Sequence, residues 1–207
     1  MGLEACNLPM GFKFYAKYSN RKESPDSGGK PSTVAPGTCD SRGVGGVDVL
    51  VNASMAKNID SFEQPTTRIG RLRMRKCDPT LALTIFVAYA PTSSYDEEKV
   101  EAFYMDLEKF HREDHAFYKV IIGDFNAKVG PRRTPEELHI GTHGLHWNDQ
   151  GERLPEFIMT TKTIHGNSQF QKPSSLRWTL NLMVRAFLRR EADDELGCLD
   201  IDIPSDD

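Results

Sequence analysis

The sequence has few of the features that mark a protein for a membrane, for export or for a redox role. No apolar run approaches the roughly 20 residues that a membrane-spanning helix needs. No signal peptide is recognisable, and the four cysteines are scattered singly, without a Cys-x-x-Cys pair that would bind zinc or form a redox dithiol. We therefore expect reduced thiols without a disulfide partner and an intracellular location, in the nucleus or the cytoplasm rather than outside the cell.

A net positive charge is also absent. The chain of 207 residues carries a formal charge of −4, so its overall electrostatics do not indicate a protein that coats nucleic acid. A nuclease that contacts a few phosphates locally stays compatible with this value. The hydrophobic fraction of 38% suits a packed core, and the length predicts one domain.

The most informative stretch covers residues 117–127, where an aromatic and β-branched run ends in Gly-Asp-Phe-Asn. This pattern predicts a buried strand with Asp124 and Asn126 at its C-terminal tip. Because these residues are two apart, an extended backbone would place both side chains on one face, as Mg²⁺ or an attacking water would require. Gly123 would let another backbone or a phosphate come close. The alternative is a strand that runs into an ordinary turn, since Asp and Asn are common turn residues.

The preceding segment predicts a strand followed by a helix. Residues 81–88 form a continuous apolar run, and Pro91 forces the chain out of the sheet, so Tyr89 is expected near the strand tip. Ser94 and Glu97 form a capping box at the start of a helix. The apolar positions of that helix are spaced three and four apart, at Val100, Phe103, Leu107 and Phe110. With the strand from residue 117, these segments predict a strand–helix–strand unit.

Two groups of basic residues allow two interpretations each. Arg71, Arg73 and Arg75 alternate with apolar residues, which predicts either a stripe that follows phosphates or the solvated face of a half-buried strand. A short basic loop follows Asn126, and it either steers a phosphodiester or is simply solvated; its residues are Lys128, Arg132 and Arg133.

Two later segments carry weaker patterns. Three histidines invite comparison with a metal cluster, but glycines interrupt any helix that would align His139, His143 and His146, so we do not expect zinc. Asp149 and Glu152 could cap a helix, although Pro155 would then fall inside it. Either that helix begins at Pro155 or the segment has been damaged. Residues 170–179 are expected to form a short strand.

The motif Val-Ile-Ile-Gly-Asp-Phe-Asn-Ala resembles the signature strand of the endonuclease/exonuclease/phosphatase superfamily, the fold of abasic-site endonucleases. Its flanks sharpen the resemblance. They are Val-Ala-Tyr-Ala-Pro-Thr before it and, after it, Asn148-x-x-Gly151-x-x-Leu154-x-x-Phe157, Gly166-Asn167-x-x-Phe170 and Arg177-Trp178-Thr179. This order is similar to the endonuclease module of RTE-clade non-LTR retrotransposons and of the craniofacial-development-protein-like genes derived from them.

The resemblance implies an α/β fold, a four-layer sandwich of two mixed sheets flanked by helices, here incomplete. It also implies DNA as the substrate and Mg²⁺ as the cofactor. In this family Asp124 would position or deprotonate the attacking water, and it would bind Mg²⁺ weakly. Asn126 would hydrogen-bond near the scissile phosphate, and Tyr89 would help to hold the developing charge. Lys128, Arg132 and Arg133 remain the candidates for substrate binding.

The chain departs from the family pattern at both ends. Residues 1–38 show no recognisable strand with the family's Asn and Glu, so we expect a disordered or loosely packed segment there. Residues 39–179 would form a partial domain, and residues 180–207 a divergent helical and acidic tail without the family's Asp and His. We therefore expect that the ancestral hydrolysis of DNA is lost or strongly impaired.

Three alternatives to an impaired enzyme stay open. The first is a working endonuclease or phosphatase completed by ligands that we do not recognise, for example Asp40 or Asp206. The second is a non-catalytic nucleic-acid-binding module that uses arginines 71, 73 and 75 with Lys128 and Arg132. The third is a relic without function.

Overall fold

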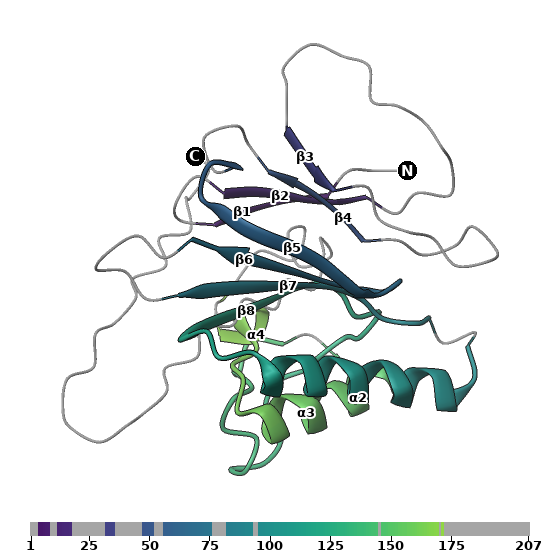
Figure 1. Cartoon of the computed structure of the whole chain (residues 1–207). Coiled ribbons are helices and arrows are strands. Elements are labelled where there is room, and N and C mark those ends of the chain that lie inside the picture. Colours follow the sequence, from purple (N-terminus) through teal and green to yellow (C-terminus); the bar gives the residue numbers. More distant parts are fainter. Residues whose placement is uncertain are drawn as a thin grey trace.

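A computed structural model describes residues 4–8, 12–17, 32–35, 47–51, 56–75, 82–92, 95–144, 146–169 and 171. These residues form two sheets and a layer of helices (Figure 1). The strands are β1 (Glu4–Leu8), β2 (Phe12–Lys17), β3 (Ser32–Ala35), β4 (Asp48–Val51), β5 (Ile59–Thr66), β6 (Ile69–Met74), β7 (Leu83–Tyr89) and β8 (Tyr118–Asp124). The helices are α2 (Glu97–Glu113), α3 (Asp149–Thr161) and α4 (Gly166–Gln169). No helix in this part of the chain has the length and apolar character required to cross a bilayer.

The first sheet has the order β1-β2-β4-β3, and every pairing within it is antiparallel. Three of its strands lie in residues 1–38, where we predicted none, and that prediction was wrong. The sequence of β2 does alternate, Phe-Lys-Phe-Tyr-Ala-Lys, but the run is short enough to escape a search for longer periods. The expectation of two mixed sheets also fails here, because the described strands of this sheet are all antiparallel.

The second sheet has the order β5-β6-β7-β8 and is mixed. Its first two pairings are antiparallel, and β7 pairs with β8 in parallel. A parallel pair needs a crossover connection, which α2 supplies. The predicted strand–helix–strand unit is confirmed. The helix begins at Glu97, and the side chain of its N-cap residue, Asp96, makes no capping hydrogen bond; Ser94 lies outside the described residues.

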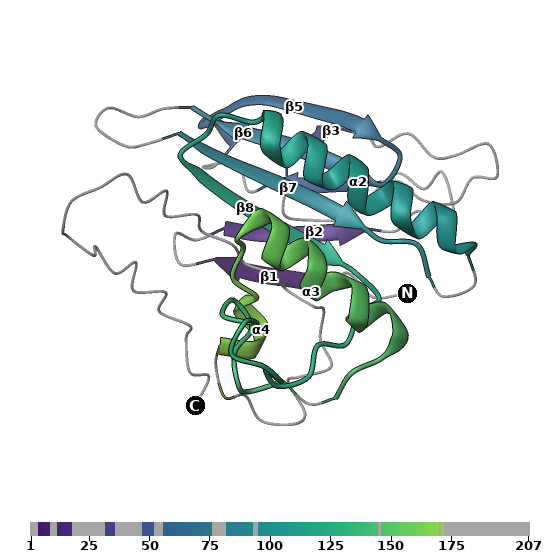
Figure 2. The same cartoon turned by 90° about the horizontal axis from the view of Figure 1, so that it is seen from below.

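Two apolar clusters lie on the two faces of this second sheet. The first sheet covers one face, where Val49 of β4 packs with Ile85 and Ile122 of β7 and β8. Helices α2 and α3 cover the other face, as Figures 1 and 2 show. The predicted apolar stripe of α2 is confirmed, with Val100, Phe103 and Leu107 buried in this second cluster. The described residues thus form a sheet–sheet–helix arrangement, and the predicted α/β fold is confirmed.

Helix α3 does not begin at Pro155 but contains it, as the capping interpretation of Asp149 and Glu152 required. It spans Asp149–Thr161 and contains Pro155, and its N-cap is Asn148 rather than Asp149. Pro155 is buried with the apolar side of the helix, so the ring adds to the core while it removes one backbone donor. The strand expected over residues 170–179 and the acidic tail lie outside the described residues, apart from Gln171.

Candidate active site at the carboxyl ends of β7 and β8

The parallel register of β7 and β8 makes Tyr89 and Asp124 direct neighbours. Both residues follow the alternation of the face that looks toward the first sheet, where Val87 and Ile122 are buried. Burial raises the pKa of Tyr89, and the negative charge of Asp124 raises it further, while Arg68 acts in the opposite direction. The phenol is therefore a neutral hydrogen-bond donor beside a carboxylate.

The chain turns immediately after Asp124. Asn126 has a φ of 51°, and its backbone N–H donates to Asp124 Oδ1 at 2.8 Å. Its side-chain Nδ2 donates to the carbonyl of Ala90 at 2.9 Å, which ties this turn to the end of β7. The expectation of an extended Asp-x-Asn segment was wrong, and the turn interpretation was right. Asp124 and Asn126 still lie at the same strand end, because the turn brings Asn126 back to the ends of β7 and β8.

Two residues of this strand end, Gly123 and Phe125, are closely packed against neighbouring residues. Phe125 is fully buried against Phe103 of α2, with ring centroids 6.1 Å apart, and this contact anchors the turn. Gly123 has a φ of 154°, and a Cβ there would lie 1.8 Å from the carbonyl oxygen of Ala88. The close approach that we predicted for Gly123 is therefore made by the backbone of β7.

Asn148 holds the loop after Asn126 in place, a role that the sequence analysis missed. Its Oδ1 accepts from the backbone N–H of Lys128 at 2.7 Å and of Gly151 at 2.8 Å. Its Nδ2 donates to the carbonyl of Asn126 at 3.0 Å. One side chain thus caps α3 and fixes the turn that carries the site. The spacing Asn148-x-x-Gly151 was the only sequence signal for it.

The predicted basic loop divides into two parts. Lys128 and Arg132 are exposed, and Lys128 lies two residues beyond Asn126. The guanidinium of Arg133 instead pairs with Glu137 at 3.0 Å and Glu152 at 2.7 Å, and it stacks over the Trp147 ring at 4.0 Å. Hydrogen bonds to Glu152 and Glu137 raise the pKa of Arg133. The donors of Arg133 are thus directed at Glu137 and Glu152 and not toward the strand end that carries Asp124.

Arg68 is a residue of this site that the sequence analysis did not single out. Its Nη1 donates to the carbonyl of Tyr89 at 3.4 Å, and its guanidinium lies 5.3 Å from the centroid of the Tyr89 ring. The centroid of the Tyr95 ring is also close, 4.9 Å from the Arg68 guanidinium. The only signal was its position just before the first residue of β6, which the antiparallel register places beside the end of β7.

The arginine stripe of β6 is paired with acids. Arg71 and Arg73 both form ion pairs with Glu63 of β5, and Arg73 Nε lies 3.5 Å from Asp114 Oδ2. The Asp114 side chain is only 2% exposed. The arginines thus lie on the more exposed face of a half-buried strand, where Arg71 and Arg73 are paired with acids. Arg75 is exposed and donates to the carbonyl of Ile59 at 3.0 Å.

The strand end offers few ligands to a metal ion. Within the described residues, no group of three or more His, Cys, Asp or Glu side chains gathers in a way that could hold a metal. Mg²⁺ is, however, often bound through one or two carboxylates together with waters and a substrate phosphate. Asp124 is one such carboxylate, and the expectation that it binds Mg²⁺ stays a prediction. Asp40 and Asp206, the other ligands considered, lie outside the described residues.

Comparison with known proteins agrees with the motifs. No family model matches the chain. The sequence is 33% identical over 139 residues, 65% of this chain, to craniofacial development protein 2 of Bos taurus, and 32% identical over the same length to that of Tragulus javanicus. The chain spans 22% and 23% of the length of these two proteins. Its fold is similar to the endonuclease domain of TRAS1, a telomere-specific non-LTR retrotransposon, with 12% identity and a TM-score of 0.48 over 73% of this chain and 63% of that one.

The chain thus has an α/β fold, as its motifs predicted. Over 65% of its length, its sequence is similar to craniofacial development protein 2.

Proposed function

We propose that this chain is a nuclease-like domain, derived from a non-LTR retrotransposon, that engages a phosphodiester of DNA at the carboxyl ends of β7 and β8. Its Mg²⁺-dependent hydrolysis is strongly reduced. The observation that carries the proposal is the register of Tyr89 with Asp124, together with the turn that returns Asn126 to the same strand end. A phenol, a carboxylate and an amide there offer donors and acceptors for a phosphate and for the water that attacks it.

Each side chain has a distinct part in this chemistry. Asp124 accepts a hydrogen bond from the attacking water and orients it toward phosphorus. Asn126 has two N–H donors on Nδ2, and because one is used by the Ala90 carbonyl, the other is available to a phosphate oxygen. Tyr89 stays protonated and donates to the charge that develops on the phosphate. When bound, Mg²⁺ would polarise the phosphate and neutralise part of its charge.

The reduced rate follows from the number of ligands. Within the described residues, Asp124 belongs to no group of three or more His, Cys, Asp or Glu side chains that could hold a metal, so Mg²⁺ is held weakly. Loss of one preorganised donor to the developing charge costs about 10²–10³ in rate, and loss of acid–base assistance costs about 10²–10⁴. Slow nicking is therefore the expected activity.

The test is a plasmid-nicking assay in Mg²⁺ with the purified chain, Asp124→Asn, and Asp60→Asn as the matched control. Asp60 is an exposed carboxylate of β5 in the same sheet. We expect slow nicking that requires Mg²⁺, disappears in D124N and persists in D60N. Equal rates for the unmodified chain and D124N would overturn the proposal, because the activity would then not depend on this strand end.

A further inference from the structure

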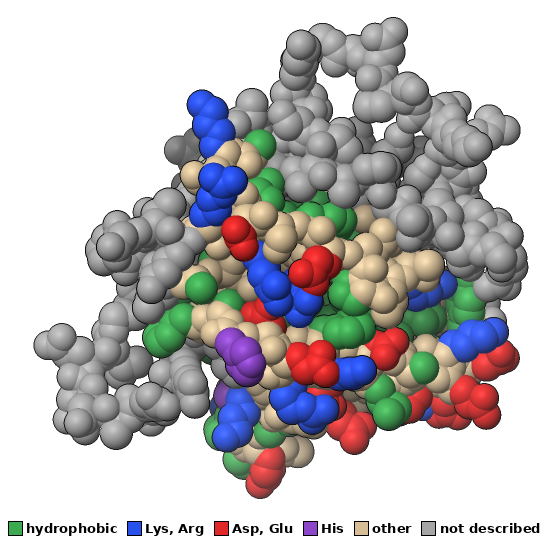
Figure 3. All heavy atoms as spheres, viewed as in Figure 1, with side chains coloured by type: hydrophobic (Ala, Val, Ile, Leu, Met, Phe, Trp, Pro, Cys, Tyr) green, Lys and Arg blue, Asp and Glu red, His purple; other side chains and the backbone are tan. Residues whose placement is uncertain are grey.

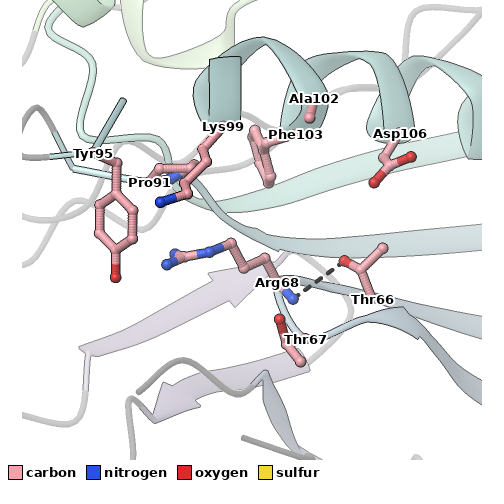
Figure 4. A pocket seen from close by; sticks show the side chains of 9 residues that line it. All are labelled: Thr66, Thr67, Arg68, Pro91, Tyr95, Lys99, Ala102, Phe103 and Asp106. Carbon is pink, nitrogen blue, oxygen red and sulfur yellow. Dashed lines mark hydrogen bonds between the residues drawn. The ribbon is translucent and has the colours of Figure 1, made fainter. Parts of the chain in front are cut away.

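A cavity of about 300 Å³ is lined in part by Arg68, the residue that contacts Tyr89 at the candidate site (Figure 4). Its walls come from the turn between β5 and β6, the loop after β7 and the first half of α2. Pro91 and Phe103 contribute apolar surface to it. A volume at the lower end of the range for small-ligand sites suits a single nucleotide unit better than a duplex.

One end of this cavity combines two cations with an aromatic ring. The Arg68 guanidinium lies 4.9 Å and Lys99 Nζ 5.7 Å from the centroid of the Tyr95 ring, and Figure 4 shows both cations pointing toward that ring. Lys99 also pairs with Asp96 at 3.1 Å, but both side chains are more than half exposed, so this pair is weak and readily exchanged.

Arg68 differs from Arg71 and Arg73 of its hairpin. Among the described residues it has no carboxylate within ion-pair distance, whereas Arg71 and Arg73 each have two. The described groups that its guanidinium contacts are two rings and one carbonyl, none of which carries a formal negative charge. An arginine in this state suits an anion, and its planar fork is well matched to phosphate.

The other end of the cavity is polar without being basic. Asp106 and Thr66 line it, on the side away from Tyr95. Thr66 Oγ1 already accepts from the backbone N–H of Arg68 at 3.2 Å, so its hydroxyl proton is directed elsewhere. A ligand that fits both ends therefore carries an anion and a flat aromatic group at the end with Arg68, Lys99 and Tyr95, and hydrogen-bond donors at the other end.

We propose that this cavity binds one nucleotide of a single-stranded nucleic-acid segment that flanks the phosphodiester at Tyr89 and Asp124. Its phosphate lies between Arg68 and Lys99, and its base stacks on Tyr95. Sequence-tolerant single-strand sites are built in this way, from cations that follow the backbone and aromatic rings that stack with bases. The proposal rests on the proposed function of the neighbouring strand end. Because Arg68 contacts both the Tyr89 carbonyl and the cavity, it connects the two.

The experiment is fluorescence anisotropy of a labelled short oligothymidylate in EDTA, so that binding is measured without cleavage. The variants are Tyr95→Ala, Tyr95→Phe and Arg68→Gln, with Lys109→Gln as a control of equal charge change at an exposed position farther along α2. We expect Y95A to weaken binding at least about 5-fold, and Y95F to bind like the unmodified chain. R68Q should reduce the slope of log affinity against log salt by about 0.7, the value for one lost phosphate contact on a single strand. K109Q should leave affinity unchanged.

The outcomes separate this inference from the proposed function. If the unmodified chain binds the oligonucleotide and Y95A binds equally well, the cavity proposal is overturned, while the nicking result for D124N stands by itself. Tighter binding of a duplex than of either of its single strands would also overturn it. If Y95A and R68Q weaken binding but D124N has no effect on nicking, the cavity proposal stands and the hydrolytic one fails. Urea unfolding of each variant verifies that the fold is retained.

Discussion

The two ends of the second sheet carry similar residues but use them differently. At one end, Arg71 and Arg73 converge on Glu63 and the buried Asp114, so each charge has a partner of opposite sign. At the other end, Arg68 faces aromatic rings, and Asp124 faces Tyr89 and the turn that follows it. Figure 3 shows acidic and basic side chains side by side over much of one face, so pairing rather than the number of charges distinguishes the ends.

The difference shows that the partners of an arginine, rather than its position in a basic run, decide whether its donors can bind a phosphate. Charge-assisted hydrogen bonds to carboxylates occupy the donors that a phosphate would need. The basic stripe of β6 is therefore a poor basis for a nucleic-acid-binding module, although it was the most visible basic pattern in the sequence. Arg68, outside that stripe, has no carboxylate partner among the described residues. We infer that the Asp114 end contributes to stability and the Asp124 end to function.

The largest loss of stability is expected for Gly123→Ala, because this substitution lies within the functional end itself. An added Cβ would meet the Ala88 carbonyl at 1.8 Å, and the φ of 154° strains any side chain. Backbone strain and overpacking together should lower the free energy of unfolding by about 3 kcal/mol or more. Urea denaturation measures this change in the free energy of unfolding. Gly70→Ala in β6 is the control, because its Cβ meets only side chains, the Phe62 ring at 3.1 Å among them, and the expected loss is about 1 kcal/mol.

The same substitution at both ends tests the comparison itself. Asp114→Asn removes the charge that faces Arg71 and Arg73 in a nearly buried site, and it should lower the free energy of unfolding by about 1–3 kcal/mol. Asp124→Asn keeps an Oδ1 that accepts from Asn126, so the free energy of unfolding should change by less than about 0.5 kcal/mol.

Nicking assays complete this test. D114N should retain Mg²⁺-dependent nicking wherever it is folded, and D124N should lose it. The division into a stabilising end and a functional end fails if D124N is the more unstable of the two, or if D114N alone abolishes nicking at a temperature where it remains folded.

A smaller effect is expected for Asn148, which links the functional end to α3. Asn148→Ala removes three hydrogen bonds and should cost about 1–2 kcal/mol. Asn148→Asp keeps the two that Oδ1 accepts, and it should cost less. Amide hydrogen exchange distinguishes the two variants: the N–H groups of Lys128 and Gly151 should exchange faster in N148A and remain protected in N148D. Equal protection in both variants would show that the loop is held by other contacts.

The strand that carries Asp124 and the helix before it were predictable because their patterns are long and consistent. The apolar run before Gly123 and the stripe from Val100 to Leu107 each repeat one period over two or more turns or pleats. The short strands β1 to β3 escaped prediction because four to six residues offer too few repeats of a period.

Within the site, sequence reasoning identified Tyr89, Asp124 and Asn126 through a family resemblance, and the structure brings them together. It did not identify Arg68 or Asn148, whose roles depend on strand register and on a turn. Residues far apart in sequence become neighbours only when register is known: Arg68 and Tyr89 are 21 positions apart, and Asn148 and Asn126 are 22. A single sequence without the fold does not show which of these residues contact each other.

The finest test follows the ionisation of Tyr89, which both charged residues of the functional end influence. Burial and the charge of Asp124 raise its pKa, and Arg68 lowers it. A tyrosine whose pKa is raised in the folded state stabilises the fold fully below its ordinary pKa of about 10, and this contribution is lost as pH rises above that value, through the raised pKa of the folded state. Ultraviolet titration, with Tyr89→Phe subtracted, measures this group. We expect D124N to lower the pKa of Tyr89 and R68Q to raise it, because one variant removes a neighbouring negative charge and the other a positive one. If D124N leaves the titration unchanged, the phenol and the carboxylate are not neighbours in solution, and the functional end loses the pair on which the proposed chemistry depends.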